Sequence, residues 1–156
     1  MAVRPLVIAA VDTGMRRGEM LALRFADIDF DRQLITLRGS TTKSGKTRFV
    51  PIPTERLRAA LEWLRLDAAG GQKPAEALVF SDEGGGGVGS FRKAWVTAVL
   101  RAHDVEVKWC ADGGYRQLAP ECEEAFRQID LLWNDIRQEY ASRLVERGVP
   151  LAQVGD

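Results

Sequence analysis

The chain has 156 residues, of which 46% are hydrophobic and 28% are charged, a composition ordinary for a soluble globular protein of one domain. No apolar run approaches the roughly 20 residues that a membrane helix needs, which excludes a protein with helical membrane spans. We see no signal peptide and expect a cytoplasmic protein with reduced thiols and no metal, since two cysteines and one histidine are too few for a typical zinc site.

The first segments predict two short helices around a glycine break. Apolar residues recur at helical spacing over residues 2–12, Gly14 interrupts the pattern, and residues 17–24 resume it. The acidic run at residues 27–31 is typical of a polar turn.

A β-hairpin and a third helix follow. Alternating β-branched residues predict strands at residues 34–38 and 47–52, joined by a polar loop at residues 39–45. Thr54 fits the N-cap of a helix that extends to about residue 66.

The second half predicts shorter elements. In chain order they are a short strand at residues 78–80, a glycine loop at 84–87 and a helix that starts at Ser90. An irregular segment at residues 103–120 and two further helices, at 121–129 and 135–147, follow. Residues 151–154 begin one more helical pattern. The fold class predicted is α+β, mainly helical, with a small antiparallel sheet made by the hairpin at about 34–52 and the strand at about 78–80.

Basic residues are concentrated in the first part of the chain, although the formal net charge is zero. Residues 1–58 hold 11 Lys and Arg against 6 Asp and Glu, whereas residues 59–156 hold 11 against 16. A basic face can meet a polyanion while an acidic face stays in solvent, so this distribution favours a nucleic-acid ligand over random patchiness.

Two arginines carry the candidate chemistry. Arg16 stands where a helix begins, so backbone N–H groups can add to an anion site there, and Glu19 is spaced to orient Arg16 or Arg17. Arg137 lies on the last helix, just after Asn134 at the expected N-cap. Guanidinium groups meet the non-bridging oxygens of a phosphodiester with two directed bonds each. Each residue alone also fits an ordinary surface ion pair or cap.

Lys43 lies at the tip of the predicted hairpin, close in sequence to Lys46 and Arg48. A lysine at a turn is usually a solvated residue, but a basic hairpin can follow a phosphate backbone, and a lysine beside a leaving oxygen can act as a general acid. The segment 44–47 resembles the end of a P-loop. Ser40 occupies the position where that motif needs glycine, and a strand follows instead of a helix, so we expect no nucleotide cofactor.

Three segments together resemble the catalytic domain of the tyrosine recombinase, or phage integrase, family. Residues 13–24 resemble its first arginine motif, residues 42–52 its lysine hairpin, and residues 134–144 its second box, normally His-x-x-Arg-His. The tail at residues 148–154 also fits. The order and spacing of these motifs make the resemblance specific over nearly the whole chain, with residues 103–130 the most divergent part.

The resemblance implies a fold and a mechanism. The fold would be the mainly helical DNA breaking-rejoining core, and the partner would be double-stranded DNA. In the family a tyrosine attacks the scissile phosphate, forms a 3′-phosphotyrosine link and releases a 5′-hydroxyl. Arg16 and Arg137 would hold the phosphate and Lys43 would protonate the leaving oxygen. Arg17, Lys46 and Arg48 would contact DNA, with no metal or other cofactor.

The chain departs from the family pattern in three places. Asn134 stands at the first histidine of the second box and cannot exchange a proton near pH 7, and Gln138 stands at the second histidine. The chain stops at Asp156, before the family's nucleophilic tyrosine, which Tyr115 and Tyr140 do not replace. The DNA-clamping domain that usually precedes the catalytic domain is also absent. We therefore expect a partial catalytic domain over residues 1–156 that is inactive alone.

Two other hypotheses stay open. A non-catalytic DNA-binding or regulatory module that reuses the fold would bind duplex DNA in a salt-sensitive manner. An interaction protein would self-associate through the apolar face that the missing C-terminal helix leaves uncovered. The basic hairpin favours the hypotheses that involve DNA.

Overall fold

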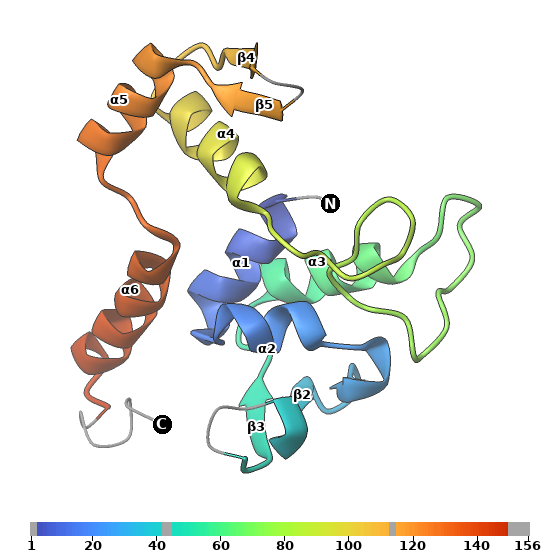
Figure 1. Ribbon diagram of the computed structural model, residues 1–156. Helices are drawn as coiled ribbons and strands as arrows, with labels where there is room; N and C mark the ends of the chain where they lie inside the picture. The colour runs from blue at the N-terminus through green and yellow to red at the C-terminus, as the bar shows by residue number, and fades with distance from the viewer. Residues whose placement is uncertain (1–2, 42–44, 113–114, 150–156) are drawn as a thin grey trace. The chain divides into compact units, whose positions relative to one another are not determined.

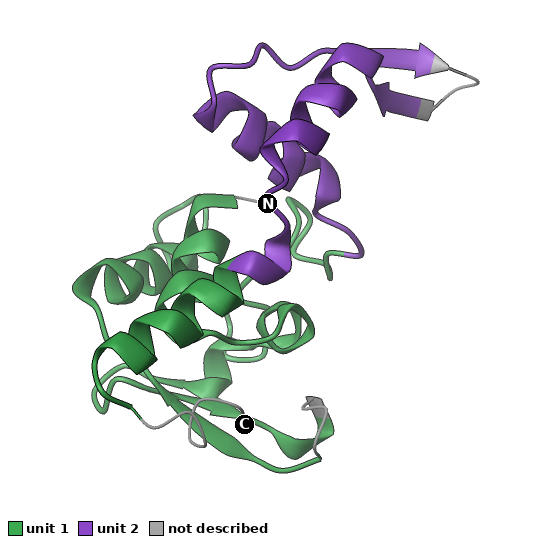
Figure 2. Cartoon of the chain, turned by 90° about the vertical axis from the view of Figure 1, so that its left-hand side faces the viewer, with its two compact units in different colours: residues 1–88, 136–156 green, residues 89–135 purple. Residues whose placement is uncertain are grey.

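A computed structural model of the chain describes residues 3–41, 45–112 and 115–149 (Figure 1). The chain divides into two compact units (Figure 2). Unit 1 comprises residues 1–88 and 136–156, and unit 2 comprises residues 89–135. The predicted tail helix at residues 151–154 lies outside the described residues.

Unit 1 combines helices with one small antiparallel sheet. Its helices are α1 (Val3–Thr13), α2 (Arg17–Ala22), α3 (Glu55–Arg65), the greater part of α6 (Trp133–Glu146) and the short 3-10 helices η1 (Phe25–Asp27) and η2 (Gly39–Thr41). The strands β1 (Ile28–Asp29), β2 (Leu34–Leu37) and β3 (Arg48–Pro51) form a sheet in the order β1-β2-β3. The predicted mixture of helices with a small antiparallel hairpin is confirmed, with Ile35 opposite Val50 in register.

The core of unit 1 lies where α1 packs against α3. Leu6 on α1 and Leu57 and Leu61 on α3 are at most 1% exposed. Burying one side chain of this size contributes about 1.5–3 kcal/mol to stability. The helical spacing of the apolar residues places them on one face of each helix, and their burial holds the two helices together.

A buried carboxylate joins the end of α1 to the start of α3. Asp12 accepts hydrogen bonds from Thr54 Oγ1 at 2.5 Å and from Arg56 Nε at 2.9 Å. Thr54 Oγ1 also accepts from the amide of Leu57 at 3.2 Å, which confirms the predicted N-cap. Burial opposes ionisation of Asp12, but the hydrogen bonds from Arg56 and Thr54 outweigh it and lower the pKa of that carboxyl.

The polar turn predicted at residues 27–31 is wrong in its first half. Asp27 ends η1 with its carboxylate buried, where it accepts from Arg38 Nε at 2.6 Å. Ile28–Asp29 then pair with β2 as a short strand. The sequence pattern predicts an exposed acidic turn here because Arg38, which pairs with Asp27, lies 11 positions further along the chain.

The short strand predicted at residues 78–80 is also wrong. Leu78 makes a single antiparallel bridge with Arg24, and the amide of Val79 donates to the Leu23 carbonyl at 2.9 Å. Val79 and Phe80 are 0% and 1% exposed. The apolar run therefore marks a buried segment and not a sheet strand.

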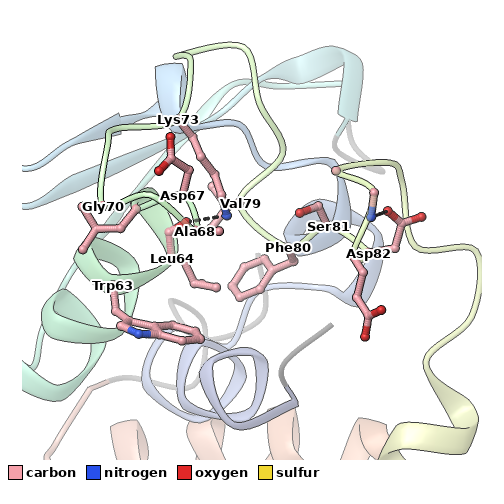
Figure 3. A pocket seen from close by; sticks show the side chains of 14 residues that line it. Trp63, Leu64, Asp67, Ala68, Gly70, Lys73, Val79, Phe80, Ser81 and Asp82 are labelled. Atoms are coloured by element: carbon pink, nitrogen blue, oxygen red, sulfur yellow. Dashed lines mark hydrogen bonds between the residues drawn. The ribbon is translucent and has the colours of Figure 1, made fainter.

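Two loops of unit 1, which begin at Asp67 and Asp82, have the same hydrogen-bonding pattern, and residues of both border one hollow (Figure 3). Asp67 Oδ1 accepts from the amides two and four positions on, at 2.9 and 2.8 Å, and Asp82 Oδ1 does the same at 2.9 and 2.8 Å. In each loop a glycine with positive φ, Gly70 or Gly85, follows three positions after the aspartate. The predicted glycine loop at residues 84–87 is thus closed by a carboxylate. The two loops border a hollow of about 760 Å³ beside the indole of Trp63.

Unit 2 has a small core of its own. It contains α4 (Arg92–Ala102), β4 (Trp109–Asp112), β5 (Tyr115–Leu118), α5 (Pro120–Ile129) and the first turn of α6. Val96, Leu100, Ala119 and Cys122 form its buried cluster. The segment predicted as irregular, residues 103–120, contains an antiparallel hairpin. Its Ala, Asp and Gly residues have low β propensity, and this hides the strands in the sequence.

Candidate phosphate-binding site

Arg16 is positioned by a sharp break between two helices. α1 ends at Thr13, Gly14 has a φ of 62°, and Arg16 is the extended N-cap residue of α2. The amide of Arg16 donates to Glu19 Oε2 at 2.8 Å. Because the carboxylate takes this N–H, the amide of Arg16 is not open to an external anion, unlike the expectation from the sequence.

Glu19 is the centre of the site. Its side chain is 2% exposed, and it accepts from Arg16 Nη1 at 3.2 Å and from Arg48 Nη2 at 2.7 Å. Burial opposes its ionisation, but the amide of Arg16, the charge of Arg48 and the two guanidinium hydrogen bonds together lower its pKa. The expectation that Glu19 orients Arg16 is confirmed, and Arg17 is exposed at the first position of α2.

Arg48 lies at the start of β3 and points into the same cluster. Its side chain is 28% exposed and pairs with Glu19. Among the described residues its buried Nε atom has no hydrogen-bond partner. The structure thus places Arg48 inside the cluster with Arg16, instead of on an open face of the hairpin.

Arg137 reaches this cluster from α6, far along the chain. Burial lowers the pKa of its guanidinium, and the charges of Arg16 and Arg48 lower it further, while Glu19 opposes them. The guanidinium of Arg137 thus lies within electrostatic range of Arg16, Glu19 and Arg48. Arg137 has no hydrogen-bond acceptor or ion-pair partner within the parts of the chain that the structure describes.

A close steric contact fixes α6 beside the break at Gly14. A Cβ atom placed on Gly14 would overlap the ring of Tyr140. Arg137 precedes Tyr140 by three positions and Arg143 follows it by three, so all three side chains share one face of α6. The charge of Arg143 lowers the pKa of Asp12 on α1, which agrees with this placement. Docking of Tyr140 therefore carries Arg137 to Arg16.

The cluster has a surplus of positive charge. Three guanidinium groups face a single carboxylate, and guanidinium groups stay protonated at neutral pH. Such a group of planar donors suits a tetrahedral oxyanion, whose oxygens accept paired N–H bonds from arginine. The geometry can bind one phosphate group.

The other predicted site residues are Lys43, Asn134 and Lys46. Lys43 lies outside the described residues. Asn134 is exposed and occupies the first turn of α6 in unit 2. It is not the N-cap, because the helix begins at Trp133 and Asp135 Oδ2 accepts from the Leu132 amide at 2.7 Å. Lys46 is exposed on the hairpin.

Two features of the site have no clear signal in the sequence. Glu19 and Arg48 are 29 positions apart, and Gly14 and Tyr140 are separated by most of the chain. The i,i+3 spacing of Arg137, Tyr140 and Arg143 is a partial signal, since it places a ring between two cations on one helix face.

In the described ranges, no helix is both long and apolar enough to span a bilayer. Within the same ranges no three side chains of His, Cys, Asp or Glu come together as metal ligands would. Both cysteines are free thiols, Cys110 exposed and Cys122 buried.

Comparison with protein families gives a match to the phage integrase family over residues 3–156. Among curated proteins, tyrosine recombinase XerC of Xanthomonas campestris pv. campestris is 35% identical over 85 residues, which cover 54% of this chain and 24% of the relative. Tyrosine recombinase XerA of Pyrococcus furiosus is 37% identical over 62 residues, which cover 40% and 21%. The chain thus matches less than a quarter of the length of these relatives.

Comparison with solved structures gives the same fold. The Tn1549 transposon integrase in complex with transposon right end DNA aligns with a TM-score of 0.64 and 15% identity, over 96% of this chain and 48% of that one. The crystal structure of XerA recombinase aligns with a TM-score of 0.61 and 16% identity, over 97% and 45%. These similarities confirm the predicted fold class.

Proposed function

The chain belongs to the phage integrase family and carries its tyrosine recombinase domain, and on that premise we propose that Arg16, Arg48 and Arg137 bind one phosphodiester of double-stranded DNA. The observation that carries this proposal is the pairing of Arg16 and Arg48 with Glu19, with Arg137 within electrostatic range of all three. Relatives of the same family are named as recombinases, and one aligned integrase structure contains DNA.

Arg137 and Arg16 have the central roles in this proposal. Arg137 has no partner of its own among the described residues, so its donors are available to the non-bridging oxygens. Arg16 shares its guanidinium with Glu19, which holds it in place. Cations placed in this way stabilise the charge that develops on a phosphate in transfer, typically by 10²–10³-fold per donor.

The chemical step that we propose is the one typical of tyrosine recombination. A tyrosine hydroxyl gives its proton to solvent as its oxygen attacks phosphorus, the bond from phosphorus to the 5′ oxygen breaks, and the 5′ oxygen takes a proton. We assign the delivery of that proton to Lys43, with Arg17 and Lys46 on the DNA backbone. Tyr140 packs against Gly14, and we assign it to packing and not to nucleophilic attack. We also propose a cytoplasmic location, where chromosomal and mobile DNA would be available as the ligand.

Duplex binding tests the phosphate site directly. We expect Arg137→Gln to weaken binding, measured by fluorescence anisotropy, by up to about eightfold at 0.1 M salt, and to reduce the slope of log affinity against log salt by about 0.9. Arg147→Gln is the matched control, because Arg147 is an exposed arginine of the same unit. Equal binding by the Arg137→Gln and Arg147→Gln variants would refute the assignment.

A non-catalytic DNA-binding module is the second candidate, and Asn134 is the observation that favours it. An amide can donate a hydrogen bond but cannot exchange a proton near neutral pH. A nicked suicide duplex tests whether this chain cleaves DNA by itself. A covalent protein–DNA adduct would rule out the module and would overturn the expected inactivity of the chain alone, whereas stable binding with no adduct agrees with both.

We also propose weak self-association as an accompanying property. Phe49, Trp63, Leu66 and Val145 of unit 1 are 64%, 60%, 46% and 39% exposed, and exposed apolar side chains favour association where they form a contiguous patch. Light scattering over a range of concentrations checks this property, and a strict monomer at high concentration would contradict it.

A further inference from the structure

Unit 2 contains a hollow of about 380 Å³ between the start of α4 and the β4–β5 hairpin. Its lining residues come from α4, both strands, α5 and the segment before α4, all within unit 2. Three of them are cations, Arg92, Lys93 and Arg116, and one is an acid, Glu123. This hollow shares no residue with the arginine cluster around Glu19.

The charges of the hollow are only partly compensated. Arg92 Nη2 lies 3.3 Å from Glu123 Oε1, and both side chains are well exposed. Lys93 and Arg116 form no ion pair with any carboxylate whose side chain the structure describes, a set that leaves out Asp112. Within that set the hollow holds two positive charges without an ion-pair partner, although residues 89–135 as a whole hold 6 Lys and Arg against 8 Asp and Glu. Positive charge gathered in a hollow of an otherwise acidic unit indicates an anionic ligand.

An aromatic ring forms one wall. Lys93 Nζ lies 5.8 Å from the centroid of the Trp109 ring, a cation–π contact. Trp109 is half-buried on β4, and Arg116 stands on the neighbouring strand β5, where Ala111 is its partner in register. The hairpin therefore places an indole and a guanidinium on the side of the hollow opposite α4.

The size and chemistry of the hollow favour a phosphate with its attached sugar. A guanidinium fork and an ammonium can share the two non-bridging oxygens of a phosphodiester. The indole offers apolar surface to a deoxyribose. An acidic peptide would offer carboxylates to the same cations but no sugar to the indole, and competition with an acidic polypeptide separates the two ligands.

We propose that Lys93, Arg116 and Trp109 form a second DNA-backbone site in unit 2, which binds one phosphate and its sugar independently of the arginine cluster in unit 1. The identification of the ligand as DNA rests on the proposed function. The evidence for an anion-binding hollow does not depend on it. The ion pair of Arg92 with Glu123 sets how much of the positive charge of Arg92 the site retains.

Salt-dependent binding by the full chain tests this proposal. The variants are Lys93→Gln, Arg116→Gln and the double variant, with Arg101→Gln as the control, because Arg101 is an exposed arginine of the same helix that does not line the hollow. Each single change should lower duplex affinity by up to about eightfold at 0.1 M salt and reduce the salt slope by about 0.9. The double variant should lose up to about 60-fold and about 1.8 in slope. Circular dichroism confirms that the variants stay folded.

The outcomes separate this site from the one in unit 1. If the double variant binds like Arg101→Gln while Arg137→Gln is weakened, the second site is refuted and the proposed function stands. If the double variant is weakened while Arg137→Gln is not, the proposed phosphate site fails and the second site stands. Displacement of DNA from the wild-type chain by polyglutamate of equal charge, but not from the double variant, would show an acidic-peptide site and overturn the proposal.

Discussion

Replacing Gly14 by alanine tests the steric contact on which the site in unit 1 depends. The residue has a φ of 62°, and its Cβ would overlap the Tyr140 ring. A left-handed conformation costs an L-residue roughly 1–2 kcal/mol, and overpacking costs roughly 1–3 kcal/mol more. We therefore expect Gly14→Ala to lower the free energy of unfolding by about 2–5 kcal/mol, a large part of the 5–15 kcal/mol typical of a domain.

Urea denaturation measures this loss, and Gly18→Ala is the matched control. Gly18 lies in α2, and a Cβ there would meet no atom within 4 Å. Alanine should stabilise that position by about 0.5–1 kcal/mol because it is the better helix former.

A double-mutant cycle isolates the contact itself. Because Tyr140→Ala removes the ring, the double variant Gly14→Ala/Tyr140→Ala should lose at least about 1 kcal/mol less than the sum of the single variants. Duplex affinity should fall with Gly14→Ala as well, since Arg137 moves with Tyr140. A loss below about 0.5 kcal/mol for Gly14→Ala, or strict additivity in the cycle, would refute the reasoning.

Two further predictions concern the buried carboxylates. Glu19→Gln should lower the free energy of unfolding, measured by urea denaturation, by about 2–3 kcal/mol. This loss is smaller than the roughly 3–5 kcal/mol typical of a fully buried ion pair, because the guanidinium groups of Arg16 and Arg48 both reach solvent. As the control, Glu139→Gln at an exposed pair should change the free energy of unfolding by less than about 0.5 kcal/mol. The pKa values of Glu19 and Asp12 are lower in the folded chain than in the unfolded chain, so their contribution to stability is complete above about pH 5 and is lost as the pH falls through the folded pKa values. Denaturation midpoints from pH 7 to pH 2 should therefore fall less steeply for Asp12→Asn and Glu19→Gln, and parallel curves would contradict both pKa shifts.

Local patterns in the sequence were sufficient for most of the fold. The helix at residues 2–12, the hairpin and the cap at Thr54 depend on neighbours within a few positions, and the structure confirms them. The strands at Trp109–Asp112 and Tyr115–Leu118 were missed because the Ala, Asp and Gly residues of this segment weaken the local pattern, and because Leu118 packs against the buried cluster of unit 2, which no local pattern shows.

The site was predictable in its charges but not in its geometry. The spacing of Arg16 and Glu19 within one helical turn allowed their pairing to be predicted. The pairing of Arg48 with Glu19, and the burial of Asp27 against Arg38, depend on the fold of the sheet and could not be predicted. Asn134 was misplaced as an N-cap because Asp135 is the residue whose side chain closes the start of α6.

The burial of Glu19 has a consequence for how the chain meets its ligand. Two long, flexible cationic side chains are already ordered by one carboxylate before any DNA arrives, so the entropy of ordering them is lost during folding and not during association. A preorganised cluster of this kind makes affinity depend on the integrity of an interior acid that never touches the ligand. Substitutions at Glu19 should thus weaken DNA binding even though they remove a negative charge, the opposite of what simple electrostatics predicts.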